Sequence, residues 1–319
     1  MFNHFFLKKT IILFALVLVA LTGYSLILFN AKPLTWSMIN VNATPQQGDA
    51  HLIQTSNGKN ILIDTGHLDP ARKALVPFLQ SKGVKKIDTV FITHPHKDHY
   101  LGLLAILESG IPIETVYMND VGRKECEAEM PLGCDYEELV NYRKMLKNNR
   151  VTLLEAKAGM TFDLDWASSL KILYAFDGVN TPVGPTDIND MSYIMLLRHG
   201  FNTALFTGDL NAKLGEYLAK ESKDLKVDIL KLPHHGAEGA APDTFFAAAD
   251  PKVVMAPSPA LLWCSARSSR MKNWVESRQI PTYVNGFSGH VTVTMRRDSF
   301  QIQQEHPETR LPLPQCPVD

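Results

Sequence analysis

The chain has 319 residues, with 32 Lys and Arg against 33 Asp and Glu, which gives a formal net charge of −1. Hydrophobic residues make up 45% and charged residues 20%, and the 19 Gly and 19 Pro follow no period, so disordered, collagen-like and low-complexity classes are excluded. The near-zero charge also argues against a dedicated nucleic-acid coat protein, although an enzyme that contacts a few phosphates remains compatible with it.

The first feature along the chain is the uncharged run Thr10–Phe29, which is long enough to cross a bilayer as a helix. Lys8 and Lys9 precede it, so the positive-inside rule predicts a single-pass anchor with the N-terminus in the cytoplasm. Residues 1–32 are therefore expected to form a cytoplasmic stub and a membrane segment, with an extracytoplasmic or periplasmic body. A cleaved signal peptide is the alternative, but the run is longer than the apolar core of such peptides. Bulky residues at its end, within Ser25–Asn30, also stand where a cleavage site needs small ones.

The body opens with short β patterns at 36–41, 51–55 and 60–64, and a turn at 56–59 joins the last two as a hairpin. Asp69 and Pro70 predict the N-cap and first residue of a helix that Pro77 kinks or shortens. A buried strand at 87–93 and a helix near 100–108 follow.

The second half repeats this alternation. Strands are expected at 170–175, 192–198, 203–207, 227–231 and 252–256, with helices near 211–220, 243–249 and 268–278. Two similar halves of this kind predict an α/β fold in which two sheets pack face to face with helices outside. We assign residues 33–304 to one domain, 120–150 to an insertion between the halves, and 305–319 to a polar, Pro-rich tail.

Four cysteines indicate the redox setting, because an even number in an oxidising compartment is typical of disulfides. Cys126 and Cys134 flank a short loop and form the natural first pair, which leaves Cys264 and Cys316 as the second. Four unrelated buried thiols are the alternative. No Cys-x-x-Cys pair occurs, so a structural zinc knuckle is not expected.

The chemistry concentrates in Thr93-His94-Pro95-His96-Lys97-Asp98-His99, at the end of a buried strand and before a helix. Imidazole and carboxylate are ligands of borderline divalent ions such as Zn²⁺, and Mn²⁺ is also accommodated. The alternation of His94 and His96 directs both toward one ion, and the turn at Lys97 brings Asp98 and His99 toward a second. A polar loop with chance histidines is the alternative, but so many imidazoles at a strand end are costly without a ligand.

Other polar residues follow predicted strands in the same way. They are Asp64 after Ile61–Ile63, Asp209 after Leu205–Gly208, and His234-His235 after Ile229–Pro233. Together with the first cluster, this order resembles the metallo-β-lactamase fold. More narrowly, it is similar to the branch that includes the hydrolase domain of the ComEC-type DNA-uptake channel and the phosphorylcholine esterase. The narrower resemblance depends on Gln47-Gly48-Asp49-Ala50, Leu62–Gly66, Asn189-x-x-Ser192, Leu205–Asp209 and Leu230–Gly236.

The resemblance implies an αββα sandwich with a binuclear metal site along one edge of the sheets. His94 and His96 would hold the first ion, and Asp209 would bridge the two. The second ion would take the ligands Asp98, His99 and His235. Zn²⁺ is the expected ion, with Mn²⁺ as the alternative. Asp64 would orient a ligand histidine.

The resemblance leaves other roles open. His234 is either the alternative ligand to His235 or free to contact substrate and protonate a leaving group. Many members of the wider superfamily have another metal histidine just before the strand that leads into Asp209, and residues 186–192 contain none. Either Asn189 or Asp190 fills in for it, or Asn189 only fixes the loop by backbone hydrogen bonds. The histidine of the uptake-channel branch after the last strands is also absent, and Arg267 and Arg270 lie in that region as candidate phosphate contacts, with a solvated helix start as the alternative.

Two ions lower the pKa of a shared water and clamp both oxygens of an in-line displacement. The expected activity is therefore hydrolysis of a phosphodiester by a hydroxide shared between the ions, with Asp98, Asp209 and His234 as the catalytic residues. The substrate is a nucleic acid or an envelope polymer. Alternatives are hydrolysis of an amide, lactone or thioester at the same centre, or a non-catalytic metal-binding or assembly protein of the cell envelope.

Overall fold

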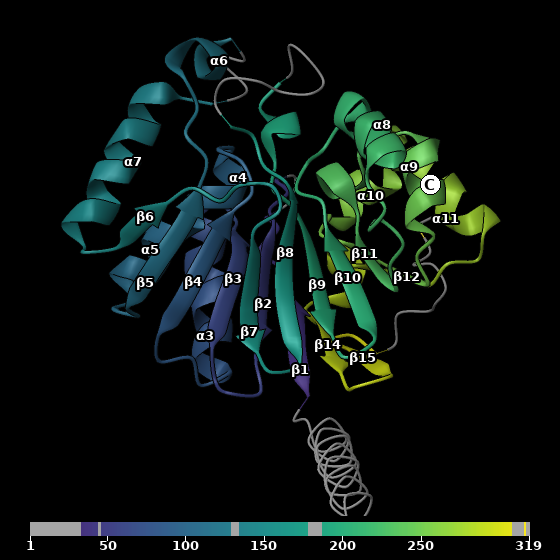
Figure 1. Cartoon of the computed structure of the whole chain (residues 1–319), viewed down its shortest axis with the longest axis horizontal. Helices are drawn as coiled ribbons and strands as arrows, with labels where there is room; N and C mark the ends of the chain where they lie inside the picture. The colour runs from purple at the N-terminus through teal and green to yellow at the C-terminus, as the bar shows by residue number, and fades with distance from the viewer. Residues whose placement is uncertain (1–32, 44–45, 129–133, 178–186, 308–315, 317–319) are drawn as a thin grey trace, which may run out of the picture.

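A computed structural model describes residues 33–43, 46–128, 134–177, 187–307 and 316. Two sheets form its centre, and Figure 1 shows their strands side by side with helices on both outer flanks. The first sheet has the order β15-β14-β1-β2-β3-β4-β5-β6 and the second has the order β13-β12-β11-β10-β9-β8-β7. The predicted sandwich of two mixed sheets with outer helices is confirmed.

The strand bounds are as follows. The first sheet contains β1 (Leu34–Met38), β2 (Ala50–Gln54), β3 (Asn60–Thr65), β4 (Ile87–Ile92), β5 (Ile113–Met118), β6 (Thr152–Leu154), β14 (Val291–Met295) and β15 (Phe300–Gln304). The second contains β7 (Thr161–Asp165), β8 (Ser168–Tyr174), β9 (Ile194–His199), β10 (Asn202–Phe206), β11 (Ile229–Lys231), β12 (Val253–Ala256) and β13 (Thr282–Val284).

Helical segments follow the same division. Those of the first half are α2 (Leu68–Pro70), the π-helical η1 (Ala71–Leu75), α3 (Val76–Ser81), α4 (Lys97–Tyr100), α5 (Gly102–Glu108), α6 (Arg123–Glu127) and α7 (Tyr136–Asn148). Those of the second half are η2 (Asn189–Met191), α8 (Ala212–Glu221), η3 (Pro233–Gly236), α9 (Asp243–Ala249), α10 (Ala260–Cys264), η4 (Ala266–Ser268), α11 (Ser269–Ser277) and α12 (Asn285–Ser288).

Three hydrophobic clusters hold the layers together. One packs the first sheet on its helices, one fills the space between the sheets, and one packs the second sheet on its own helices. The alternation of a strand explains how one sheet serves two clusters: Leu62 faces the helices, whereas Ile61 and Ile63 on the same strand β3 face the other sheet. Apolar residues on both faces therefore specify a central sheet rather than a surface one.

The order of the strands places the polar residues at one edge. β3, β4 and β5 run parallel, as do β10, β11 and β12. Since carboxyl ends of parallel strands meet at the same edge of a sheet, the residues after β3, β4, β10 and β11 gather there. Gly102 allows the turn between α4 and α5 to approach β3, because a Cβ on it would lie 1.9 Å from the Thr65 carbonyl oxygen.

Two expectations about the fold are wrong. The helix after β3 begins at Leu68 with His67 as N-cap, one residue before Asp69, and a π-helical turn precedes Pro77, which has no N–H to donate. Residues 120–150 are no insertion between halves, because they connect the parallel strands β5 and β6 of one sheet. The last strands, β14 and β15, return to the first sheet and lie beside β1.

Both predicted disulfides are confirmed. Cys126 pairs with Cys134 between α6 and α7, and Cys264 at the end of α10 pairs with Cys316. No helix within the described ranges combines the length and the apolar character that spanning a membrane needs. The predicted anchor Thr10–Phe29 lies outside the described residues and stays a prediction.

Candidate metal centre

Asp64 connects the end of β3 to the loop after β4. Its Oδ1 accepts the Thr93 amide at 2.8 Å, and its Oδ2 accepts the Thr93 hydroxyl and His99 Nδ1, each at 2.8 Å. The residue is fully buried and has a φ of 57°, a conformation in which a non-glycine residue is strained. Because Nδ1 of His99 donates to this carboxylate, Nε2 keeps its lone pair free for a ligand.

Four side chains from both halves of the sandwich converge at one point: Asp98, His99, Asp209 and His235. Nε2 of His99 and Nε2 of His235 each lie 3.3 Å from Asp209 Oδ2, and Nε2 of His235 lies 3.3 Å from Asp98 Oδ2. One ligand atom from each of these four residues falls within 4.8 Å of the others. Nδ1 of His235 donates to the Pro257 carbonyl at 2.9 Å, so its Nε2 also presents a lone pair.

A second pair of donors lies beside this cluster. His94 Nε2 and His96 Nδ1 lie 3.1 Å apart, and the His94 ring centroid is 4.1 Å from that of His99. His94 Nδ1 lies 3.0 Å from the Thr93 hydroxyl oxygen, which already donates to Asp64. His94 therefore donates through Nδ1, and its Nε2 lies on the side of His96, as the predicted first ion would require.

His234 and His235 reach the centre through an unusual backbone. They have φ values of 49° and 55°, so the turn after β11 directs two successive side chains toward the same edge. His234 Nε2 is 3.9 Å from Asp209 Oδ2, its Nδ1 is 3.2 Å from Asn211 Oδ1, and 23% of its side chain is exposed. Asn211 in turn donates to Asp187 at 2.7 Å, which orients its oxygen toward the ring.

The histidines and carboxylates of the centre strongly shift each other's pKa values. Burial opposes the charged form of His99, but the carboxylates of Asp209, Asp64 and Asp98 outweigh it, so the pKa of His99 lies well above its usual range. The same balance raises the pKa of His235 to about 9. Burial also works to raise the pKa of Asp209, yet the neighbouring histidines hold it well below its usual range.

These donors fit a divalent ion. The Nε2 atoms of His99 and His235 and the Oδ1 atom of Asp209 are buried and make no hydrogen bond within the described chain. Such groups are costly in a protein interior unless a partner compensates them, and imidazole with carboxylate is the donor set of Zn²⁺ or Mn²⁺. An ion here would displace the protons that the carboxylates otherwise hold on the imidazoles.

Several residues near the centre were missed as functional candidates. Lys231 and Asp49 are both 1% exposed, and the Lys231 ammonium contacts Asp49 Oδ2 and lies 3.6 Å from Asp209 Oδ1. His51 Nε2 lies 2.6 Å from Asp49 Oδ1. The lysine within the otherwise apolar run Ile229–Leu232 was the available signal.

The remaining predicted residues lie at different places. Asn189 opens η2, and its Oδ1 is buried with no hydrogen-bond partner among the described residues. Arg267 lies close enough to His234 for its charge to help lower the pKa of that imidazole, after the larger effect of burial. Arg270 donates to the Glu238, Ala240 and Ala241 carbonyls and pairs with Asp243 at 2.8 Å. Its predicted phosphate contact stays a prediction.

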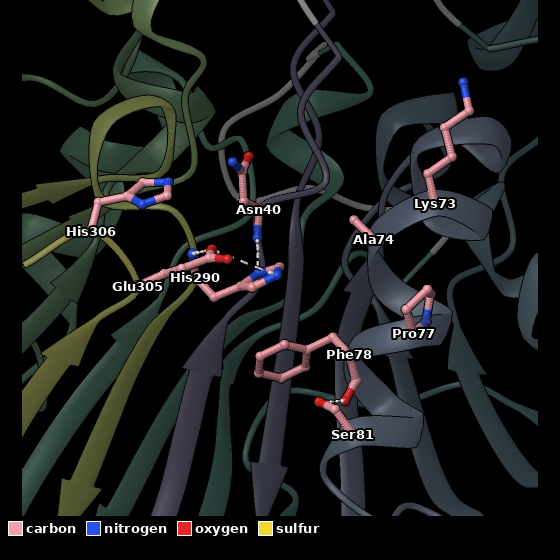
Figure 2. A pocket seen from close by; sticks show the side chains of 9 residues that line it. All are labelled: Asn40, Lys73, Ala74, Pro77, Phe78, Ser81, His290, Glu305 and His306. Atoms are coloured by element: carbon pink, nitrogen blue, oxygen red, sulfur yellow. Dashed lines mark hydrogen bonds and ion pairs between the residues drawn. The ribbon is translucent and has the colours of Figure 1, made fainter.

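A separate hollow of about 500 Å³ lies beside α3, and Figure 2 shows its lining side chains. Phe78 and Pro77 come from α3, and His290, Glu305 and His306 from the opposite wall. His290 Nδ1 accepts the Asn40 amide at 3.0 Å, and burial lowers the pKa of His290. None of the metal-centre residues lines this hollow, so it is distinct from the candidate site.

A match to a protein family agrees with the fold and the candidate centre. The profile of the metallo-beta-lactamase superfamily matches residues 43–125, which include Asp64 and the motif from His94 to His99. This part of the chain is therefore similar to the metallo-beta-lactamase superfamily, and the converging His and Asp side chains agree with that likeness.

More particularly, the chain is similar to competence proteins of the ComEC type, as its motifs predicted. It is 24% identical to ComE operon protein 3 of Bacillus subtilis over 225 residues, 66% of this chain and 27% of that protein. It is 26% identical to Recombination protein 2 of Haemophilus influenzae over 301 residues, 90% of this chain and 32% of that protein. The chain thus spans about a quarter to a third of the length of these relatives.

A solved structure adds a likeness of the fold alone. The CmlA beta-hydroxylase E377D mutant superposes with a TM-score of 0.51 at 12% identity, over 83% of this chain and 54% of that one.

Proposed function

We propose that the chain is a binuclear, metal-dependent phosphodiesterase. The observation that carries this proposal is the convergence of the buried Nε2 atoms of His99 and His235 on Asp209 Oδ2, at 3.3 Å each, although neither atom makes a hydrogen bond within the described residues. A structural core would satisfy or omit such groups, whereas a metal centre requires them. The adjacent His94 and His96 pair would supply donors for the other ion of the binuclear centre.

We assign a separate role at the centre to each of these residues. His94 and His96 would hold the first ion, Asp98, His99 and His235 would hold the second, and Asp209 would be a ligand shared by both. Bound divalent ions supply Lewis acidity, which activates water and neutralises charge on a phosphoryl group. Asp64 fixes the ring of His99 and its tautomer.

Arg267, which lies near His234, favours an anionic substrate. Arg267 is only partly buried, and its guanidinium forms no ion pair within the described part of the chain. A free guanidinium beside His234 suits the oxygens of a phosphodiester better than the neutral carbonyl of an amide, lactone or thioester. We assign His234 to substrate contact and to protonation of the leaving group, because its Nε2 faces Asp209 and its side chain is partly exposed.

We also propose that Thr10–Phe29 anchors the chain in the membrane, with the N-terminus in the cytoplasm and the catalytic domain outside. Two disulfides are consistent with such a compartment. The substrate is then a nucleic acid or an envelope polymer that carries phosphodiester bonds.

The test uses the full chain, purified in mild detergent. Its metal content is measured by mass spectrometry, and it is assayed on bis(p-nitrophenyl) phosphate with Zn²⁺ or Mn²⁺, beside an ester, a lactone and a β-lactam. Asp209→Asn should abolish hydrolysis, whereas Asp228→Asn, which removes an equivalent charge at the far end of β11, should keep it. Two ions with hydrolysis of the diester support the proposal. Two ions with hydrolysis of an acyl substrate alone would replace it, and a chain that never binds metal would favour a non-catalytic role.

A further inference from the structure

A buried lysine lies directly behind the metal centre. The side chain of Lys231 is 1% exposed, and its Nζ donates to the Gly208 carbonyl at 2.7 Å and contacts Asp49 Oδ2. An ammonium group in a protein interior is tolerated only where partners surround it. Since Gly208 immediately precedes Asp209, the lysine is fastened to the segment that carries this carboxylate.

The opposite side of the ammonium is fixed by a chain of polar contacts. Asp49 Oδ1 lies 2.6 Å from His51 Nε2, and His51 Nδ1 accepts the Trp36 indole N–H at 3.2 Å. The Asp49 amide donates to the Asp98 carbonyl at 3.1 Å, which connects the same residue to a metal ligand. All three side chains behind Lys231 are buried, so its ammonium has one place to occupy.

The two oxygens of Asp209 therefore meet different surroundings. Oδ2 faces Nε2 of His99 and of His235, whereas Oδ1 faces Nζ of Lys231 at 3.6 Å. Oδ1 is buried and makes no hydrogen bond within the described residues. The Asp209 amide donates to the Ser192 hydroxyl oxygen at 3.0 Å, which fixes the backbone from which this carboxylate extends.

We propose that Lys231 is a positioning residue that holds Oδ1 of Asp209 and thereby presents Oδ2 to the metal. The ammonium gives the carboxylate one preferred orientation, so the ligand is placed before an ion arrives. Groups that hold a metal ligand in this way affect metal affinity about 10- to 100-fold. The inference rests on the metal centre of the proposed function but not on its substrate.

A competing explanation is that Lys231 only neutralises Asp49. A variant set separates the two roles: Lys231→Met, the double variant Asp49→Asn with Lys231→Met, and Lys252→Met as a control. The double variant removes both buried charges together and so restores the balance that Lys231→Met alone upsets. Lys252 is an exposed lysine that pairs with Asp228 at 2.7 Å and lies away from the centre.

The measurement is binding of Co²⁺ to the metal-free full chain, followed by its visible absorption, with Zn²⁺ affinity from competition against a chromophoric chelator. Thermal unfolding of each metal-free variant is recorded in parallel. We expect the double variant to unfold near the wild-type temperature and to bind both ions about 10- to 100-fold more weakly, with an altered Co²⁺ spectrum. The Lys252→Met control should match the wild type.

Wild-type affinity and an unchanged spectrum in the double variant would overturn the positioning role, while leaving the proposed function intact. Should the wild type itself bind no Co²⁺, the metal centre and this inference would both fail. Loss of diesterase activity alone decides neither question, because the readout is metal binding. A Lys231→Met protein that fails to fold does not prevent the test, since the double variant carries it.

Discussion

Asp64→Asn changes one atom of a side chain that three donors contact. The Thr93 amide can still donate to the remaining oxygen, and the Thr93 hydroxyl can reverse its role and accept from the new amide group. His99 has no such freedom, because its Nδ1–H would face an N–H donor at the distance where it now donates. The imidazole must therefore shift its proton to Nε2, the atom that points at Asp209.

The size of the effect follows from the one bond that cannot adapt. A hydrogen bond between a charged and a neutral group contributes about 1.5–3 kcal/mol. At 1.4 kcal/mol for each factor of ten, metal affinity should fall roughly 10- to 150-fold. The metal-free protein should unfold close to the wild-type temperature, since the variant keeps its shape and gives up a buried charge.

Asp228→Asn is the matched control. Asp228 Oδ2 accepts both the amide and the hydroxyl of Thr203, at 2.8 and 3.1 Å, so the same pair of contacts occurs there without a histidine. Titration with Co²⁺ and competition with a chelator give the affinities, and the Co²⁺ spectrum reports the ligand set. An Asp64→Asn protein that binds metal as tightly as the Asp228→Asn control would refute the tautomer argument.

Three further outcomes are expected. A chelator should remove the two ions in separate steps, because one site has four converging ligands and the other rests on two histidines; simultaneous release would contradict this. Replacing Cys264 and Cys316 by Ala should lower the free energy of unfolding by about 4 kcal/mol, since the bridge closes a loop of 52 residues, and urea denaturation measures it. Gly102→Ala should destabilise the fold by at least ~1–3 kcal/mol because its Cβ would overlap a backbone oxygen, whereas Gly239→Ala, with open space around it, should not; equal stabilities would be the contrary result.

Strand ends were the most informative part of the sequence. Asp64, the His94 motif and His235 each follow an apolar run, and such runs reveal buried parallel strands. Local pattern sufficed there, because each group is positioned by the strand that precedes it. The order of the strands at the far side of the first sheet could not be predicted from the sequence. β14 has the alternation of a strand, yet no local pattern indicates that it pairs with β1, which lies near the other end of the chain.

The contacts of the residues behind the centre could not be predicted from the sequence either. His51 and Lys231 belong to different sheets and meet only through Asp49, and nothing in the spacing of these residues marks the pair. What local reading offers is a lysine in a buried strand, a residue type that is rarely buried without a partner. The partners of such a lysine depend on tertiary contacts, and only the structure identifies them as the carboxylates of Asp49 and Asp209.

The centre also explains why two sheets are needed. His94, Asp98 and His99 come from the loop of the first sheet, whereas Asp209 and His235 come from the second. A divalent ion bound by both groups joins the two layers of the sandwich at one edge. The polar contacts from Asp64 on one side and from Lys231 on the other are then equivalent in purpose: each holds a ligand of its own sheet in place, so that the distance across the edge is set by the packing between the sheets. Substitutions in the cluster between the sheets should for this reason change metal affinity even where they touch no ligand.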